Sequence, residues 1–154
     1  MNRLVIKTST GEAMDLPIYD KVSVITGYSA TGKTKLLNWI KACKELYSIN
    51  PKDITECSKN FDDILIITTK EECKSLLLAG YSHKIIFIDR FNYISNEELN
   101  NFVINSENIF ILVGHGNTAN FASQDAILGV RYEKGEYHFY QIYENGILNA
   151  TDII

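Results

Sequence analysis

Three short apolar segments constrain the fold of this 154-residue chain more than any other feature. Residues 64–68, 85–89 and 109–113 consist almost entirely of Ile, Leu, Val and Phe. Unbroken apolar runs of this length are typical of strands that are covered on both faces, as in a buried parallel sheet. Because stretches with helical character separate the segments, they predict alternating strands and helices, the pattern of an α/β protein.

Helix start signals support that alternation. Thr69 and Glu72 have the spacing of a capping box, and the helix that they open is expected to end at Gly80. Ser95 and Glu98 repeat the spacing and predict a second helix, through about residue 104. Both predicted helices lie between apolar segments, which places them as connections between neighbouring parallel strands.

The two ends of the chain have a different pattern. Residues 3–7 and a second stretch that ends at Ile18 predict a hairpin. Near the other end, strands are predicted over residues 126–132 and 137–143, and the pair Asn145-Gly146 is a strong two-residue turn signal. We therefore expect antiparallel strands at both ends of a parallel sheet.

Composition narrows the class of protein and of partner. The apolar share of 45% and charged share of 22%, without a membrane-spanning run or a signal-peptide pattern, predict a single cytoplasmic domain over residues 1–154. The net charge is −4, and only three of the fifteen basic residues are arginines, so nucleic acid is not an expected partner. The three cysteines lack the spacing of a metal site or disulfide framework.

Residues 27–34 have the sequence of a phosphate-binding loop. They fit the pattern G-x-x-x-x-G-K-[ST], follow a β-branched strand over residues 22–26, and open a helix expected to end near Ser48. With this composition, a chance match somewhere in the chain has odds of roughly 1 in 200. The residues expected to bind phosphate are Gly27, Tyr28, Ser29, Ala30, Thr31, Gly32, Lys33 and Thr34.

Each part of this loop has a physical role. Glycine allows the backbone to approach phosphate closely, and the N–H groups of residues 30–34 would form an anion nest at a helix N-terminus. Lys33 is expected to contact the β- and γ-phosphates as a catalytic residue, and the Thr34 hydroxyl to bind Mg²⁺. The motif therefore predicts ATP or GTP, with Mg²⁺, as the ligand.

These residues give the chain its resemblance to the P-loop NTPase superfamily. The resemblance implies a three-layer α/β/α fold with a central, mainly parallel sheet, here with antiparallel hairpins at both termini. It also implies an apolar strand that ends in a metal-binding acid, and residues 85–89 supply one that ends in Asp89. The strand at 64–68 is expected to separate the two motif strands, as in the ATPase-type branch. The chain resembles a stripped ABC- or AAA-like ATP-binding domain, without the ABC signature sequence or Q-loop.

Two further residues are expected close to the phosphates. Arg90 stands where ATPases of this branch carry a glutamate that activates water, and a guanidinium cannot accept a proton at neutral pH. Three roles for Arg90 stay open: a sign of slow or absent hydrolysis, a cation that stabilises phosphate charge, or a surface ion pair. His115, after the strand at 109–113, is expected to sense the γ-phosphate, and Glu97 and Glu98 are weaker candidates for a substitute base.

The sequence favours an NTP- and Mg²⁺-binding protein with weak or partner-dependent hydrolysis. The alternative is a non-catalytic, nucleotide-dependent interaction module, in which NTP orders residues 90–96 and 114–125 for a protein partner or a second copy of the chain. A small-molecule kinase fits less well, because such enzymes clamp phosphates with several arginines.

Overall fold

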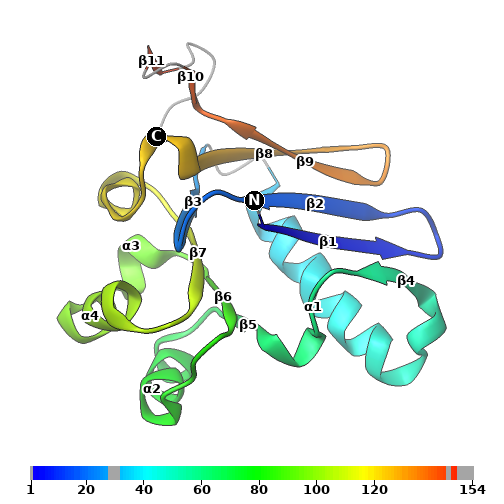
Figure 1. Cartoon of the computed structure of the whole chain (residues 1–154), viewed down its shortest axis with the longest axis horizontal. Coiled ribbons are helices and arrows are strands. Elements are labelled where there is room, and N and C mark those ends of the chain that lie inside the picture. The colour runs from blue at the N-terminus through cyan, green and yellow to red at the C-terminus, as the bar shows by residue number, and fades with distance from the viewer. Residues whose placement is uncertain (1, 28–31, 145–146, 149–154) are drawn as a thin grey trace.

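The structure is a computed structural model that describes residues 2–27, 32–144 and 147–148. These residues form an α/β protein around a nine-stranded, mostly parallel and strongly curled sheet with the order β4-β1-β2-β9-β8-β3-β7-β6-β5 (Figure 1). The strands are β1 (Asn2–Thr8), β2 (Ala13–Ile18), β3 (Val22–Ile25), β4 (Ile54–Cys57), β5 (Ile64–Ile67), β6 (Ile85–Ile88), β7 (Ile109–Val113), β8 (Ile127–Glu133) and β9 (Glu136–Gln141). Two short strands, β10 (Tyr143–Glu144) and β11 (Ile147–Leu148), pair separately.

The helices are α1 (Lys33–Ile49), α2 (Lys70–Ala79), α3 (Phe91–Ile94) and α4 (Glu97–Asn105), with 3₁₀ turns η1 (Pro51–Asp53), η2 (Phe61–Asp63), η3 (Gly116–Phe121) and η4 (Gln124–Ala126). Helices α2, α3 and α4 connect strands of the parallel part of the sheet, whereas α1 leads from β3 to the antiparallel strand β4. Among the described residues, none of these helices has the length and apolar character needed to cross a membrane.

Five strands make up the parallel part of the sheet. In the order β8-β3-β7-β6-β5 each is parallel to its neighbours, which confirms the prediction of parallel strands from the three apolar segments. Ile25 pairs with Val113, and Leu112 pairs with Ile88, so β3, β7 and β6 end at one edge of the sheet. Loops that follow such strand ends are the usual place for a ligand site in an open α/β sheet.

The strand at 64–68 is not where the sequence places it. β7 lies between the phosphate-loop strand β3 and the aspartate strand β6, whereas β5 pairs with β6 and, among the described residues, forms an edge of the sheet. Order along the chain does not fix order across a parallel sheet, because the connecting helix can pass over a neighbouring strand position. The prediction that 64–68 separates the two motif strands is therefore wrong.

Antiparallel strands occupy the other half of the sheet. β1 pairs with β2 and β4, and β8 pairs with β9, all antiparallel, as predicted for both ends of the chain. A short parallel contact joins these groups, with Ala13 opposite Glu136 and Met14 opposite Tyr137. The predicted turn Asn145-Gly146 lies outside the described residues, although β10 and β11 on either side of it pair antiparallel.

Helices cover both faces of the parallel strands. On one face α1 packs against a cluster that includes Phe87 and Ile111, and on the other α2, α3 and α4 pack against Ile88 and Leu112. Figure 1 shows α1 beside the β1–β2 hairpin and the other three helices on the opposite side of β5, β6 and β7. Successive side chains of β6 and β7 therefore point into different clusters, which explains why these strands are apolar throughout.

The helix starts were only partly predicted. Thr69 caps α2 by accepting a hydrogen bond from the Glu72 N–H, and Gly80 ends the helix in the left-handed conformation, as expected. The second capping box is wrong: the cap of α4 is Asn96, whose side chain accepts the Leu99 N–H at 2.8 Å. Ser95 instead ends the short α3, which the sequence did not reveal. Asn and Ser cap helices about equally well, so the pattern alone could not separate them.

Candidate functional site

The phosphate-binding motif joins β3 to α1. The Thr26 N–H donates to the Leu128 carbonyl oxygen at 2.9 Å, which continues the pairing of β3 with β8 to the start of the loop. Gly27 has φ of 130° and Gly32, directly before α1, has φ of 102°, values that favour glycine. Gly27 and residues 32–34 are described; the predicted contacts of Tyr28, Ser29, Ala30 and Thr31 lie outside the described residues.

Lys33 is the buried cation of the site. Lys33 is the first residue of α1 and is 7% exposed. The ammonium donates to the Gly27 carbonyl oxygen and lies 3.2 Å from His115 Nε2. Burial lowers the pKa of Lys33, an effect that the negative charge of Asp89 opposes. A partly desolvated ammonium at a helix N-terminus is suited to binding an anion.

His115 reaches Lys33 from the end of β7. Partial burial and the charge of Lys33 both lower the pKa of His115, so its imidazole is neutral at pH 7. Because an ammonium can only donate, Nε2 of His115 is the acceptor in this contact. The Lys33 ammonium is thus shared between a loop carbonyl oxygen and a neutral imidazole, both of which an anion could replace.

Asp89 follows β6 directly. Its N–H donates to the Ile67 carbonyl oxygen at 2.8 Å, and its carboxylate accepts the Arg90 N–H at 2.9 Å. These two bonds fix the aspartate at the edge where β3 and β7 also end. The structure therefore brings together Gly27, Lys33, Asp89 and His115 from three strand ends, although they span 89 positions of the sequence (27 to 115, both included).

The oxygen donors at this edge fit Mg²⁺. Asp89 supplies a carboxylate, and Thr34 is an exposed hydroxyl in the first turn of α1. Mg²⁺ prefers one or two carboxylate oxygens with hydroxyl, water and phosphate oxygens, so these two residues match a nucleotide-bound ion. Within the described ranges, no group of three or more His, Cys, Asp or Glu side chains could hold a metal ion unaided.

Arg90 extends away from this group of residues toward the edge strand β5. Its guanidinium donates to the Thr68 carbonyl oxygen at 3.1 Å, and its backbone is left-handed, with φ of 48°. Glu97 and Glu98 are exposed in the first turn of α4. Asp89 is the one carboxylate in the described part of the chain whose charge raises the pKa of Lys33.

Three neighbouring residues support His115, and two of them, Asn92 and Thr118, were not singled out from the sequence. Asn92, in α3, accepts the His115 N–H through Oδ1 at 3.3 Å. A Cβ atom on Gly114 would lie 2.7 Å from Asn92 Oδ1 and 2.8 Å from Thr118 Oγ1. Thr118 is 1% exposed, and its hydroxyl has no hydrogen-bond partner among the described residues. Only the glycines that flank His115 hinted at this close approach.

Comparisons with family models and with curated proteins find no relative of this chain. No protein-family model matches it, and a search of curated proteins finds no similar sequence.

Proposed function

We propose that the protein binds a nucleoside triphosphate, ATP or GTP, together with Mg²⁺, and hydrolyses it weakly or only with a partner. The observation that carries this proposal is the buried Lys33 ammonium, held at the N-terminus of α1 by Gly27 and His115. Burial of an ammonium costs free energy unless an opposite charge or hydrogen bonds compensate. A polyanion is therefore the ligand that would best compensate the buried charge of Lys33.

The sheet order supports a P-loop NTPase-like, three-layer fold of the ATPase-type branch. One strand, β7, separates the phosphate-loop strand β3 from the aspartate strand β6, and helices cover both faces. In this proposal the loop N–H groups and Lys33 bind the phosphates, while Thr34 and Asp89 hold the ion. Bound Mg²⁺ would neutralise phosphate charge, and His115 would contact the γ-phosphate as Lys33 turns toward it.

Weak hydrolysis follows from the residue after Asp89. A guanidinium cannot act as a base, and Arg90 already donates to the Thr68 carbonyl oxygen. The neutral His115 is the group close to Lys33 that could accept a proton from water. A second role, as a nucleotide-dependent interaction module, is favoured by the bond from His115 to Asn92, since it links the site to the surface helix α3.

Thermal unfolding with and without Mg²⁺ and ATP or GTP tests the proposal. Ligand that binds only the folded state raises Tm, and at about 100 times Kd it stabilises by about 2.7 kcal/mol. We expect Tm to rise for the wild type and not for Lys33→Ala. Lys35→Ala is the matched control, because Lys35 lies on the same helix and its ammonium lies over the Tyr132 ring. Its Tm should rise as that of the wild type does. Equal responses of the two variants would refute the proposed site.

Release of inorganic phosphate then separates the two roles. Turnover by the wild type that disappears in Lys33→Ala, while Lys35→Ala keeps it, would identify an NTPase. Tight binding without turnover would identify the interaction module.

A further inference from the structure

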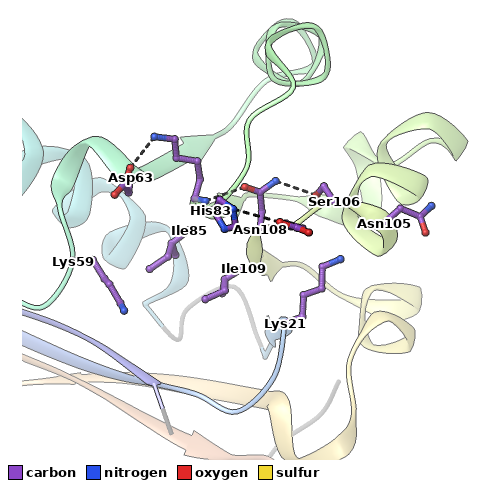
Figure 2. Close-up of a pocket in the computed structure, with 11 residues that line it drawn as sticks. Lys21, Lys59, Asp63, His83, Ile85, Asn105, Ser106, Asn108 and Ile109 are labelled. Carbon is purple, nitrogen blue, oxygen red and sulfur yellow. Dashed lines mark hydrogen bonds and ion pairs between the residues drawn. The ribbon is translucent and has the colours of Figure 1, made fainter.

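A cavity with charged and apolar lining residues lies at the opposite end of the parallel strands from the phosphate loop. It has a volume of about 470 Å³ and opens at the amino ends of β3, β6 and β7 (Figure 2). Lys21 immediately precedes β3, whereas the phosphate loop follows that strand, so the length of β3 separates the two places. The volume is in the range of small-molecule sites.

Ion pairs within the cavity wall neutralise part of its charge. Lys84 Nζ lies 2.7 Å from Asp63 Oδ1, and this contact raises the pKa of Lys84. His83 Nε2 lies 3.4 Å from Glu107 Oε2. Asp63 is therefore paired with a lysine, and Glu107 lies beside a histidine.

Two further lysines have no carboxylate partner. The ammonium of Lys59, between β4 and η2, makes no hydrogen bond or ion pair with any described residue, and the Lys59 carbonyl oxygen accepts the Cys57 thiol. Lys21 donates to the Ile104 carbonyl oxygen at 2.7 Å, which leaves its charge uncompensated within the part of the chain that the structure describes. An acidic protein of net charge −4 thus has an excess of positive charge around this one cavity.

The cavity also has an apolar floor and a fixed wall. Figure 2 shows Ile85 and Ile109 between Lys59 on one side and Lys21 on the other. Asn108 is 3% exposed, accepts the Lys84 N–H, and donates to the Ser106 hydroxyl oxygen at 3.0 Å. Because Ser106 accepts that bond, its own O–H is left to donate to a ligand.

We propose that this cavity binds a small organic dianion. Its two anionic groups would pair with Lys59 and Lys21, and its apolar middle would lie on Ile85 and Ile109. Two cations on either side of an apolar surface favour a ligand that has two anionic groups and an apolar middle over a simple anion. The site does not depend on nucleotide binding, since it shares no lining residue with the phosphate loop.

Nuclear magnetic resonance titration with isophthalate, a rigid aromatic dicarboxylate, tests this site. Backbone signals report where the probe binds, at constant ionic strength, and benzoate and benzamide serve as the monoanionic and neutral comparisons. We expect isophthalate to bind more tightly than either, with the largest shifts at Ile85, Ile109 and their neighbours. Lys59→Gln should weaken binding about fivefold, since it removes one partly exposed ion pair.

Lys52→Gln is the matched control, because Lys52 lies in η1 and does not line the cavity. It should bind isophthalate as the wild type does. The proposal is overturned if Lys52→Gln and Lys59→Gln weaken binding equally, if benzoate binds as tightly as isophthalate, or if the shifts map to residues 27 and 32–34. The Lys59 ammonium has no partner among the described residues, so we expect Lys59→Gln to leave the fold intact, and well-dispersed spectra would verify this.

Discussion

At the scale of single residues, the site depends on the contact between the Lys33 ammonium and the His115 imidazole. Burial lowers the pKa of Lys33, and the charge of Asp89 opposes part of that effect, while burial and the charge of Lys33 lower the pKa of His115. Bound phosphate would act in the opposite sense on His115, because a nearby negative charge favours the imidazolium.

The lowered pKa of His115 predicts a pH dependence of stability. At pH values between the pKa of His115 in the folded protein and its ordinary pKa of about 6.5, the unfolded chain binds more protons than the folded chain. The free energy of unfolding therefore falls as the pH drops through about 6.5. We expect the free energy of unfolding of the wild type to fall more than that of His115→Gln between pH 7.5 and 5.5 (values chosen to lie on either side of about 6.5). Urea unfolding at the two pH values measures the difference. Parallel losses would show that His115 keeps its ordinary pKa.

Gly114 is predicted to be intolerant of a side chain. Its φ is not left-handed, so the cost of Gly114→Ala comes from the close approach of Asn92 and Thr118. We expect a loss of about 1–3 kcal/mol in the free energy of unfolding. Part of that loss should be recovered when Asn92→Ala is added, since this removes one of the two clashing atoms. Simple additivity of the two variants would place the cause elsewhere.

At the scale of elements, three side chains form hydrogen bonds with the backbone of the edge strand β5 and of Thr68, which follows it. Lys44 donates to the Ile64 carbonyl oxygen, Arg90 donates to that of Thr68, and Glu72 Oε1 accepts the Thr68 N–H at 3.0 Å. Burial would raise the pKa of Glu72, but hydrogen bonds from Thr68 and Thr69 outweigh it and lower the pKa. Capping the open backbone of a short edge strand limits pairing with other chains, which gives Arg90 a structural role.

The start of α4 provides a prediction at this scale. Asn96→Ala removes the acceptor of the Leu99 N–H and should cost about 1 kcal/mol of stability. Ser95→Ala, one residue earlier, should change stability by less than about 0.5 kcal/mol, because the Ser95 side chain has no partner among the described residues. Urea unfolding of both variants decides between the two caps. A larger loss in Ser95→Ala would restore the capping box predicted from the sequence.

Sequence reasoning succeeded where periodicity is local and failed where tertiary contacts decide. The apolar runs at 64–68, 85–89 and 109–113 predicted parallel strands because burial on both faces leaves a direct mark on composition. Nothing local could place β5 at the sheet edge, since strand order depends on where each crossover lands.

The residues of the candidate site were also predicted where the signal is local and missed where tertiary contacts decide. The motif predicted Lys33 and the strand end predicted Asp89, and the structure places their charges close enough to interact. Asn92 was missed because its role is a single bond to a backbone N–H 23 positions away. Arg90 was recognised as a departure, but its contact with Thr68 depends on β5 lying beside β6.

At the scale of the whole molecule, one curled sheet places two lysine-containing regions at opposite ends of its parallel strands. One contains Lys33 beside Asp89 and His115, and the other contains Lys21 and Lys59 around a cavity. The antiparallel hairpins extend the sheet around α1 and bury its apolar face. The parallel strands therefore form a fixed frame, and the loops at their ends carry the proposed chemistry.

The central claim, that Lys33 and Asp89 belong to an NTP·Mg²⁺ site, is tested most directly by calorimetric titration with a non-hydrolysable ATP or GTP analogue. We predict one site per chain, binding that strengthens with Mg²⁺, and a loss of that Mg²⁺ dependence in Asp89→Asn with an affinity lower by about tenfold. Absence of binding by the wild type with Mg²⁺ present, for both analogues, would contradict the account.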